Sequence, residues 1–234
     1  MNAKELEAEY KKILGDTHFW NCVDIENARG NYLWSSVNPS GGEDRKIPFN
    51  LHWVGTDNYS LDPKSKYWNK LKGKIGRHIN QFGHIDLFPI LCADEAVFLK
   101  KYRGKEESPE FKRFVALLKI TQEFIEDLRP KLIVYSNAST SYLWGWPKQT
   151  WMGYILEPVV FSCPISSGRI SQHPKDSLFR IVGINTGNQV IKKEKTTALD
   201  GTYLLIDNQN DNHFGHPEIS DEDLDRIIKE LDIE

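Results

Sequence analysis

Residues 31–42, NYLWSSVNPSGG, decide how the rest of this chain is interpreted. The run at 32–37 is rich in aromatic and branched side chains, which predicts a short buried strand. It ends in NPSGG, where proline cannot donate to a sheet ladder and glycine permits backbone angles closed to other residues. A buried strand followed by this turn puts Asn38 at the carboxyl edge of a sheet, where open α/β sheets bind ligands. The alternative interpretation is an ordinary turn without a ligand.

The sequence on either side of this strand alternates between helical and strand patterns. We predict helices at 3–14, 63–80, 110–128 and 221–231, strands at 84–90, 131–135, 179–184 and 203–206, and a hairpin-like segment at 151–170. Such alternation is typical of an α/β fold. We therefore expect one domain over residues 1–234, a three-layer sandwich whose central, mainly parallel sheet has helices on both faces. An elaborated segment is expected at 162–202.

Length and composition indicate a soluble globular chain. Of the 234 residues, 27% are charged and 39% are hydrophobic, and no apolar run is long enough for a membrane helix. The start, MNAKELEAEYKK, is unlike a signal peptide. Cys22, Cys92 and Cys163 lie far apart, which favours a reducing compartment over a zinc site or disulfide framework. We expect a cytoplasmic protein without membrane contact.

Charge is unevenly distributed along the chain. The net charge of −3 argues mildly against nucleic-acid binding, because phosphate contacts usually leave a basic footprint. Residues 64–78, KSKYWNKLKGKIGRH, nevertheless contain no acid. This run predicts a basic surface that could contact DNA phosphates, although a lysine-rich helix face is more often simply solvated. Its candidate DNA-binding residues are Lys64, Lys66, Lys70, Lys72 and Arg77.

The common catalytic motifs are absent from the sequence. It contains no G-x-G-x-x-G, P-loop, G-x-S-x-G or H-E-x-x-H pattern. His213 and His216 are spaced so that they could share a metal ion, but no third ligand accompanies them, and we expect no metal site. What remains is a series of polar residues that follow predicted strands: Asn38, Asp86, Asn137 and the loop at 213–217.

If the centre of the sheet is parallel, these strand ends converge on one crevice. Phe49 lies between the first two strands and is a candidate stacking residue for an extruded base. Each residue also has an ordinary interpretation: Phe49 as core, and Asp86 or Asn137 as a helix cap or strand end. An enzyme that acts on DNA bases is favoured by this combination of an amide, a stacking aromatic residue, a histidine and a lysine-rich helix.

The order and spacing of these motifs resemble the uracil-DNA glycosylase superfamily, especially its mismatch-specific branch. For the family strand ending in G-x-N-P-G, this chain has SVNPS at 36–40; for P-x-x-R-F-W-K it has PKSKYWNK at 63–70. The family's T-D-L-V corresponds to IDLF at 85–88, and W-G-N/H-A to SNA at 136–138. His216-Pro217 is similar to the closing H-P-S-P motif, with His213 or Asn208 as alternatives. The resemblance spans residues 30–220.

The resemblance implies hydrolysis of the N-glycosidic bond of uracil, or a related damaged or mismatched base, in single- or double-stranded DNA. It implies that Asn38 holds the attacking water, that Phe49 stacks on the base, and that His216 or His213 donates to the departing base or a phosphate. Pro39, Ser40, Asp86 and Asn137 would line the substrate pocket. No cofactor is implied, and we expect a monomer.

Two departures from the family pattern affect activity more than fold. Ser36 and Ser40 replace glycines at positions where the family backbone approaches the substrate closely. Two other functions therefore stay open: a non-catalytic nucleic-acid- or nucleotide-binding protein of the same fold, and a glycosidase that acts on free nucleosides.

Overall fold

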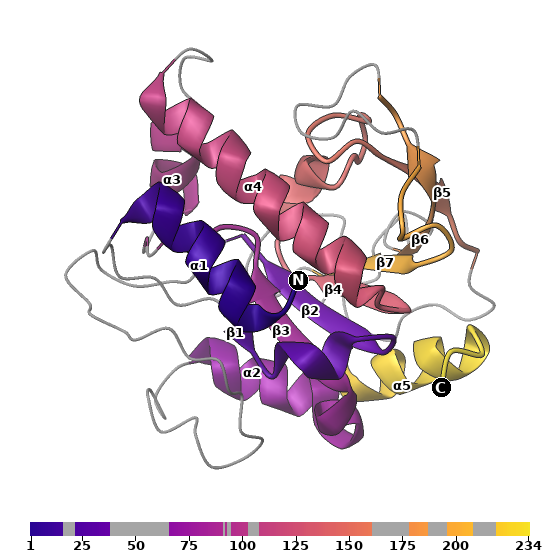
Figure 1. Cartoon of the computed structure of the whole chain (residues 1–234). Helices are drawn as coiled ribbons and strands as arrows, with labels where there is room; N and C mark the ends of the chain where they lie inside the picture. Colours follow the sequence, from indigo (N-terminus) through magenta and orange to yellow (C-terminus); the bar gives the residue numbers. More distant parts are fainter. Residues whose placement is uncertain are drawn as a thin grey trace.

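A mixed seven-stranded sheet runs through the molecule with helices around it (Figure 1). The computed structural model describes residues 1–15, 22–37, 66–90, 92, 95–102, 108–160, 178–186, 196–207 and 219–234. The strands are β1 (Cys22–Val23), β2 (Tyr32–Ser36), β3 (Phe82–Asp86), β4 (Leu132–Tyr135), β5 (Tyr154–Pro158), β6 (Leu178–Ile184) and β7 (Tyr203–Ile206). The predicted α/β class is confirmed.

The spatial order of the strands is β1-β3-β2-β4-β7-β6-β5. The four central strands, β3, β2, β4 and β7, are parallel, whereas β1, β6 and β5 add to the two ends in antiparallel fashion. The expectation of a mainly parallel sheet thus fits the centre and fails at both ends. The predicted hairpin-like segment at 151–170 lies partly outside the described residues, because 161–177 are not described; its described strand, β5, pairs antiparallel with β6.

The helices are α1 (Ala3–Leu14), α2 (Lys66–Ile75), α3 (Glu95–Tyr102), α4 (Pro109–Leu128) and α5 (Asp221–Glu230), with 3-10 turns η1 (Ile25–Ala28), η3 (Gly76–Gln81) and η4 (Ala138–Leu143). Local sequence sets several of these boundaries. Ser108 caps α4 by accepting from the Phe111 N–H, with Pro109 in the first turn. The predicted helix 63–80 ends its α-helical part at Ile75, because Gly76 takes a positive φ of 38°.

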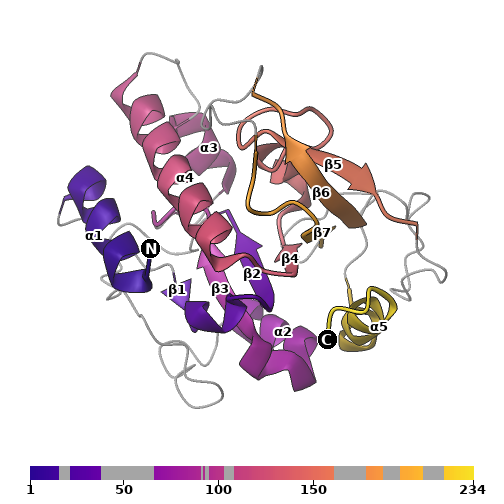
Figure 2. The same ribbon diagram turned by 45° about the vertical axis from the view of Figure 1, so that its right-hand side comes forward.

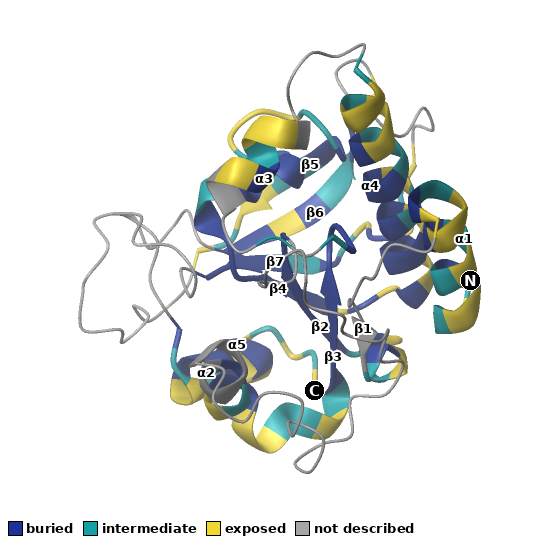
Figure 3. Ribbon diagram, turned by 90° about the vertical axis from the view of Figure 1, so that its left-hand side faces the viewer, coloured by how far each residue is buried: buried dark blue, intermediate teal, exposed yellow. Residues whose placement is uncertain are grey.

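Helices pack against both faces of the sheet because strand side chains alternate between them. On one face, Leu33, Ile133 and Leu204 pack with apolar residues of α1 and α4. On the other, Trp34, Val134 and Leu205 pack with α2 and α5. Figures 1 and 2 show α1 and α4 on the opposite side of the strands from α2 and α5. Figure 3 shows β2, β3 and β4 buried, whereas β5 and β6 have partly exposed residues. The central strands β4 and β7 therefore read as continuous apolar runs, LIVY and YLLI, whereas β2 and β3 also contain polar residues.

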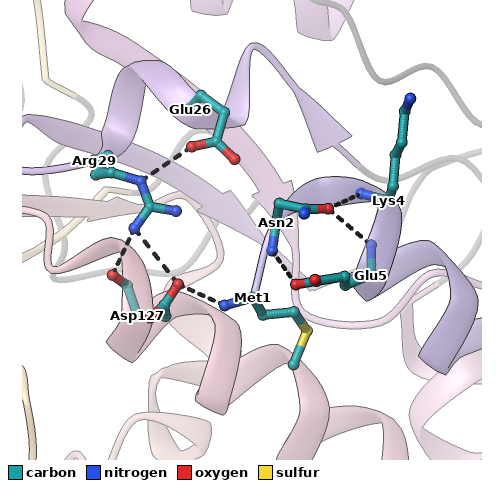
Figure 4. A network of polar contacts seen from close by, with 7 residues as sticks. All are labelled: Met1, Asn2, Lys4, Glu5, Glu26, Arg29 and Asp127. Atoms are coloured by element: carbon teal, nitrogen blue, oxygen red, sulfur yellow. Dashed lines mark hydrogen bonds and ion pairs between the residues drawn. The ribbon is translucent and has the colours of Figure 1, made fainter.

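Polar contacts fasten α1 to the end of α4 and to η1 (Figure 4). The Met1 amino group lies 2.8 Å from Asp127 Oδ2, and Arg29 donates to the Asp127 backbone carbonyl and to Glu26. A hydrogen bond from the amino group lowers the pKa of Asp127. Because Asp127 and Arg29 are about half exposed, we expect the network to contribute little to stability.

Candidate functional site

The carboxyl ends of β3, β2, β4 and β7 lie side by side at one edge of the sheet. Ser36 of β2 is in register with Asp86 of β3, and Ser35 with Tyr135 of β4. Tyr135 is in turn in register with Ile206 of β7. Each strand is followed by or ends in a polar residue, so the predicted convergence of Asp86 and Asn137 on this edge is confirmed. We call this the carboxyl edge.

Two hydrogen bonds hold the chain immediately before Asn38. Asn137 Oδ1 accepts from the Val37 N–H at 3.1 Å, and the Val37 carbonyl accepts from the Phe88 N–H at 2.9 Å. The first bond joins the end of β4 to the end of β2, and the second joins β2 to the residues after β3. Because both backbone groups of Val37 are engaged, the chain is fixed up to the last described residue before the NPSGG sequence.

Asp86 is buried at the carboxyl edge and has an unusual environment for a carboxylate. Ser36 Oγ donates a hydrogen bond to its Oδ1, and His84 Nε2 lies 3.8 Å from the same oxygen. Burial raises the pKa of Asp86 to about 8, although the Ser36 hydrogen bond acts in the opposite direction. At neutral pH the side chain is therefore largely a carboxylic acid, which can donate a hydrogen bond as well as accept one.

Asp207 follows β7 and forms a buried ion pair that was not among the predicted site residues. Lys74 of α2 donates to Asp207 Oδ2 at 2.8 Å, and the Ile219 N–H donates to Oδ1 at 2.8 Å. The Lys74 ammonium also lies 5.9 Å from the centroid of the Trp34 ring. The pair connects α2, the carboxyl edge and the chain entering α5. A sequence pattern could have indicated this pair, because Lys74 lies three residues after Leu71 and therefore on the apolar face of its helix.

The structure places only part of the predicted DNA-binding surface. Lys72 is half-buried on α2, and Arg77 of η3 is 63% exposed with its Nη1 at 3.3 Å from Asp225 Oδ1. Asp225 of α5 also contacts His78 and Lys229, and the Lys229 hydrogen bond lowers its pKa. The acidic helix α5 thus lies against the basic segment and compensates part of its charge.

Several predicted site residues lie outside the described part of the chain: Asn38, Pro39, Ser40, Phe49, Lys64, His213 and His216. Lys66 and Lys70 belong to α2, but the structure does not describe their side chains.

Comparison with protein-family models, with curated proteins and with solved structures finds no match for this chain. Within the described ranges, no group of three histidine, cysteine or carboxylate side chains is arranged to hold a metal ion. None of the helices described is both long and apolar enough to cross a membrane. The case for a function therefore depends on the carboxyl edge itself.

Proposed function

We propose that this protein is a DNA base-excision glycosylase with a three-layer fold of the uracil-DNA glycosylase type, which hydrolyses the N-glycosidic bond of uracil or a related damaged or mismatched base. The observation that carries the proposal is the path of the chain at the carboxyl edge. The chain leaves β2 toward β3 on one side and leaves β4 toward β7, β6 and β5 on the other. Ligands of open α/β sheets bind where neighbouring strands diverge in this way. Val37, the last described residue before Asn38 in the sequence, directly follows β2 at that point.

The proposed chemistry requires a water molecule on one side of the sugar and stabilisation of the departing base on the other. Bond breakage develops positive charge on the sugar and negative charge on the base. In the proposal, the Asn38 side-chain carbonyl accepts a hydrogen bond from the water and aims its oxygen at the sugar carbon. The C–N bond breaks with its electron pair going to the base, the water oxygen bonds to the sugar carbon, and the departing base anion takes up the proton that the water loses. His216 or His213 stabilises the anion as it forms. Phe49 stacks on the base.

Asp86 and Asn137 have distinct roles in this proposal. A protonated Asp86 carboxyl can donate a hydrogen bond to a carbonyl oxygen of the base, as an ionised carboxylate could not. Asn137 already uses its Oδ1 to hold Val37. It therefore acts as a positioning residue for the chain that leads into Asn38 as well as a member of the pocket wall.

The direct test is base release from oligonucleotides that carry uracil, hypoxanthine or a G·T mismatch, followed by alkaline cleavage of the abasic sites. Release from at least one substrate is expected. Asn38→Ala should keep the fold and the DNA affinity but lower the rate by roughly a hundredfold or more, because it removes the group that positions the water. Asn185→Ala, a matched amide deletion beyond β6, should leave the rate unchanged. An Asn38→Ala rate equal to the wild-type rate would contradict the assignment.

The second candidate function is a glycosidase that acts on free nucleosides. The ion pair of Arg77 with Asp225 favours it, because a basic surface neutralised by α5 is less suited to phosphate backbones. Release of a base from free deoxynucleosides but not from any oligonucleotide would select this function. Binding of nucleic acid or nucleotide without release of any base would instead indicate the non-catalytic member of the same fold.

A further inference from the structure

Three partly exposed aromatic side chains lie together beyond the carboxyl edge: Phe111 of α4, Tyr142 of η4 and Trp151. Their ring centroids are 6.1 Å apart for Phe111 and Trp151 and 6.5 Å apart for Tyr142 and Trp151. The three residues come from separate segments of the chain, and only tertiary folding brings them together. We call them the aromatic rim.

The aromatic rim is supported from the interior by a continuous series of rings. Phe88, two residues beyond Asp86, stacks on Phe114 with centroids 4.0 Å apart. Phe114 meets Trp151 edge-to-face at 5.3 Å. The series therefore leads from the end of β3 outward to the rim. Tyr142 belongs to η4, which begins directly after Asn137. The rim is thus close to the candidate site.

The backbone of Trp151 is held in a conformation that costs energy. Its φ is +57°, which is unfavourable for a bulky residue. Neighbouring contacts fix the segment: the Met152 N–H donates to the Leu143 carbonyl, and Gln122 Nε2 donates to the Met152 carbonyl. A Trp ring held at a fixed angle loses little conformational entropy when a flat ligand stacks on it.

Charges beside the aromatic rim suit a polyanion. Lys112 directly follows Phe111, and Lys148 comes three residues before Trp151; both are exposed. Glu110 and Arg113 of the same helix are also exposed, so these four charged side chains together carry two positive charges. Aromatic side chains for bases together with cations for the backbone are the features that bind single-stranded nucleic acid without sequence preference.

We propose that Phe111, Tyr142 and Trp151 form a stacking platform for unpaired bases of single-stranded DNA next to the target nucleotide. This inference rests on the proposed glycosylase function and adds to it a preference for single-stranded over duplex substrate. Bases in a duplex are stacked on each other and cannot lie on the rim without melting. The platform binds the flanking strand, whereas the residues around Asn38 act on the target base.

The test is binding of a fluorescently labelled, undamaged 12-mer, as a single strand and as a duplex, measured by anisotropy at low salt. The wild type should bind the single strand more tightly. Phe111→Leu keeps apolar volume without a π face and should weaken binding of the single strand by about fivefold to a hundredfold. Phe111→Tyr should restore it. Tyr203→Leu, a partly buried aromatic at the amino end of β7, is the matched control and should bind like the wild type.

The lysine side chains near the aromatic rim allow an independent test through the salt dependence of binding. Lys148→Ala should reduce the salt slope of single-strand binding by about 0.7. Lys119→Ala, in α4 about two turns beyond Lys112, is the control and should leave the slope unchanged. Equal binding by wild type and Phe111→Leu, tighter binding of the duplex, or no binding of the single strand would each overturn the platform. Base release is scored separately on damaged oligonucleotides. If the wild type binds the single strand but releases no base, the proposed glycosylase function is refuted. If base is released and Phe111→Leu leaves release from single-stranded substrate unchanged, the platform is refuted.

Discussion

At the scale of single residues, the carboxyl edge is distinguished by polar side chains in positions that normally hold apolar ones. Asp86 and Asp207 are both buried there, yet their environments differ. Asp207 has a lysine partner 2.8 Å away, whereas the Oδ1 of Asp86 is engaged by the Ser36 hydroxyl. The Lys74–Asp207 ion pair contributes to the architecture, whereas burial raises the pKa of the Asp86 carboxyl to about 8. Asp86 is therefore the carboxyl group on this edge suited to proton-dependent chemistry.

The raised pKa of Asp86 predicts a specific pH dependence of stability. The folded protein keeps the Asp86 proton up to about pH 8, whereas the unfolded chain loses it near the ordinary pKa of an aspartate, 3.8. Between these values the folded state binds one proton more, so this residue's contribution to stability falls as pH rises through the window. Asp86→Asn should remove that component, and its stability relative to wild type should rise from pH 4 to pH 8.

Urea unfolding at several pH values measures this difference. Asp200→Asn, an exposed acid in the turn before β7, is the control and should leave the pH dependence of the unfolding free energy close to that of the wild type. If the wild-type and Asp86→Asn curves run parallel from pH 4 to pH 8, the Asp86 carboxyl is ionised throughout and the assigned environment is wrong.

At the scale of elements, the Lys74–Asp207 pair couples α2 to the segment that leads into α5. Both side chains are almost fully buried, at 8% and 0% exposed. Lys74→Met would leave the Asp207 charge buried without its partner, which costs about 3–5 kcal/mol. The double variant Lys74→Met/Asp207→Asn removes both charges while its amide oxygen still accepts from the Ile219 N–H. We expect it to recover much of the loss in urea unfolding. A double variant that is less stable than Lys74→Met would contradict this account.

The close packing between η1 and β3 leads to a second prediction at the scale of elements. A Cβ added at Gly83 would lie 2.9 Å from the Asp24 carbonyl oxygen and from Ile25 backbone atoms. Gly83→Ala should therefore destabilise the fold by about 1–3 kcal/mol. Gly73 of α2 has nothing within 4 Å of the same position, so Gly73→Ala should stabilise by roughly 0.5–1 kcal/mol because alanine is the better helix former. Thermal unfolding of both variants tests the contrast, and shifts of the same sign would contradict it.

At the scale of the whole molecule, charge compensation between helices decides how much of the basic segment can meet a phosphate backbone. Asp225 of α5 contacts Arg77, His78 and Lys229. Asp225→Asn removes that carboxylate, so it should raise affinity for DNA and steepen the salt slope by about one unit. Asp200→Asn has the same change in net charge and should have a smaller effect. Equal effects of the two variants would mean that only net charge matters, and Arg77 would lose its assigned contact with DNA.

The predicted strands and helices were mostly recovered in the structure because their patterns are local. Apolar runs such as LIVY at 132–135 and the capped helix at 109–128 carry their own boundaries. The antiparallel pairing of β5 with β6 and of β6 with β7 was not predicted, since apolar runs do not encode the direction of a partner strand. Of the predicted site, Asp86 and Asn137 were correctly expected at one edge of the sheet. The roles of Asn38, Phe49, His213 and His216 stay predictions.

The sequence by itself determined the α/β class, the buried strand before Asn38 and the polar residues that end the strands. These follow from periodicity, capping and turn residues, which act over a few neighbours. Only the tertiary structure decided that Asn137 holds Val37, that Lys74 is buried against Asp207, and that Phe111, Tyr142 and Trp151 meet. Each of these contacts joins residues from separate segments, and burial, pKa and ion pairing depend on which surfaces the sheet order brings together.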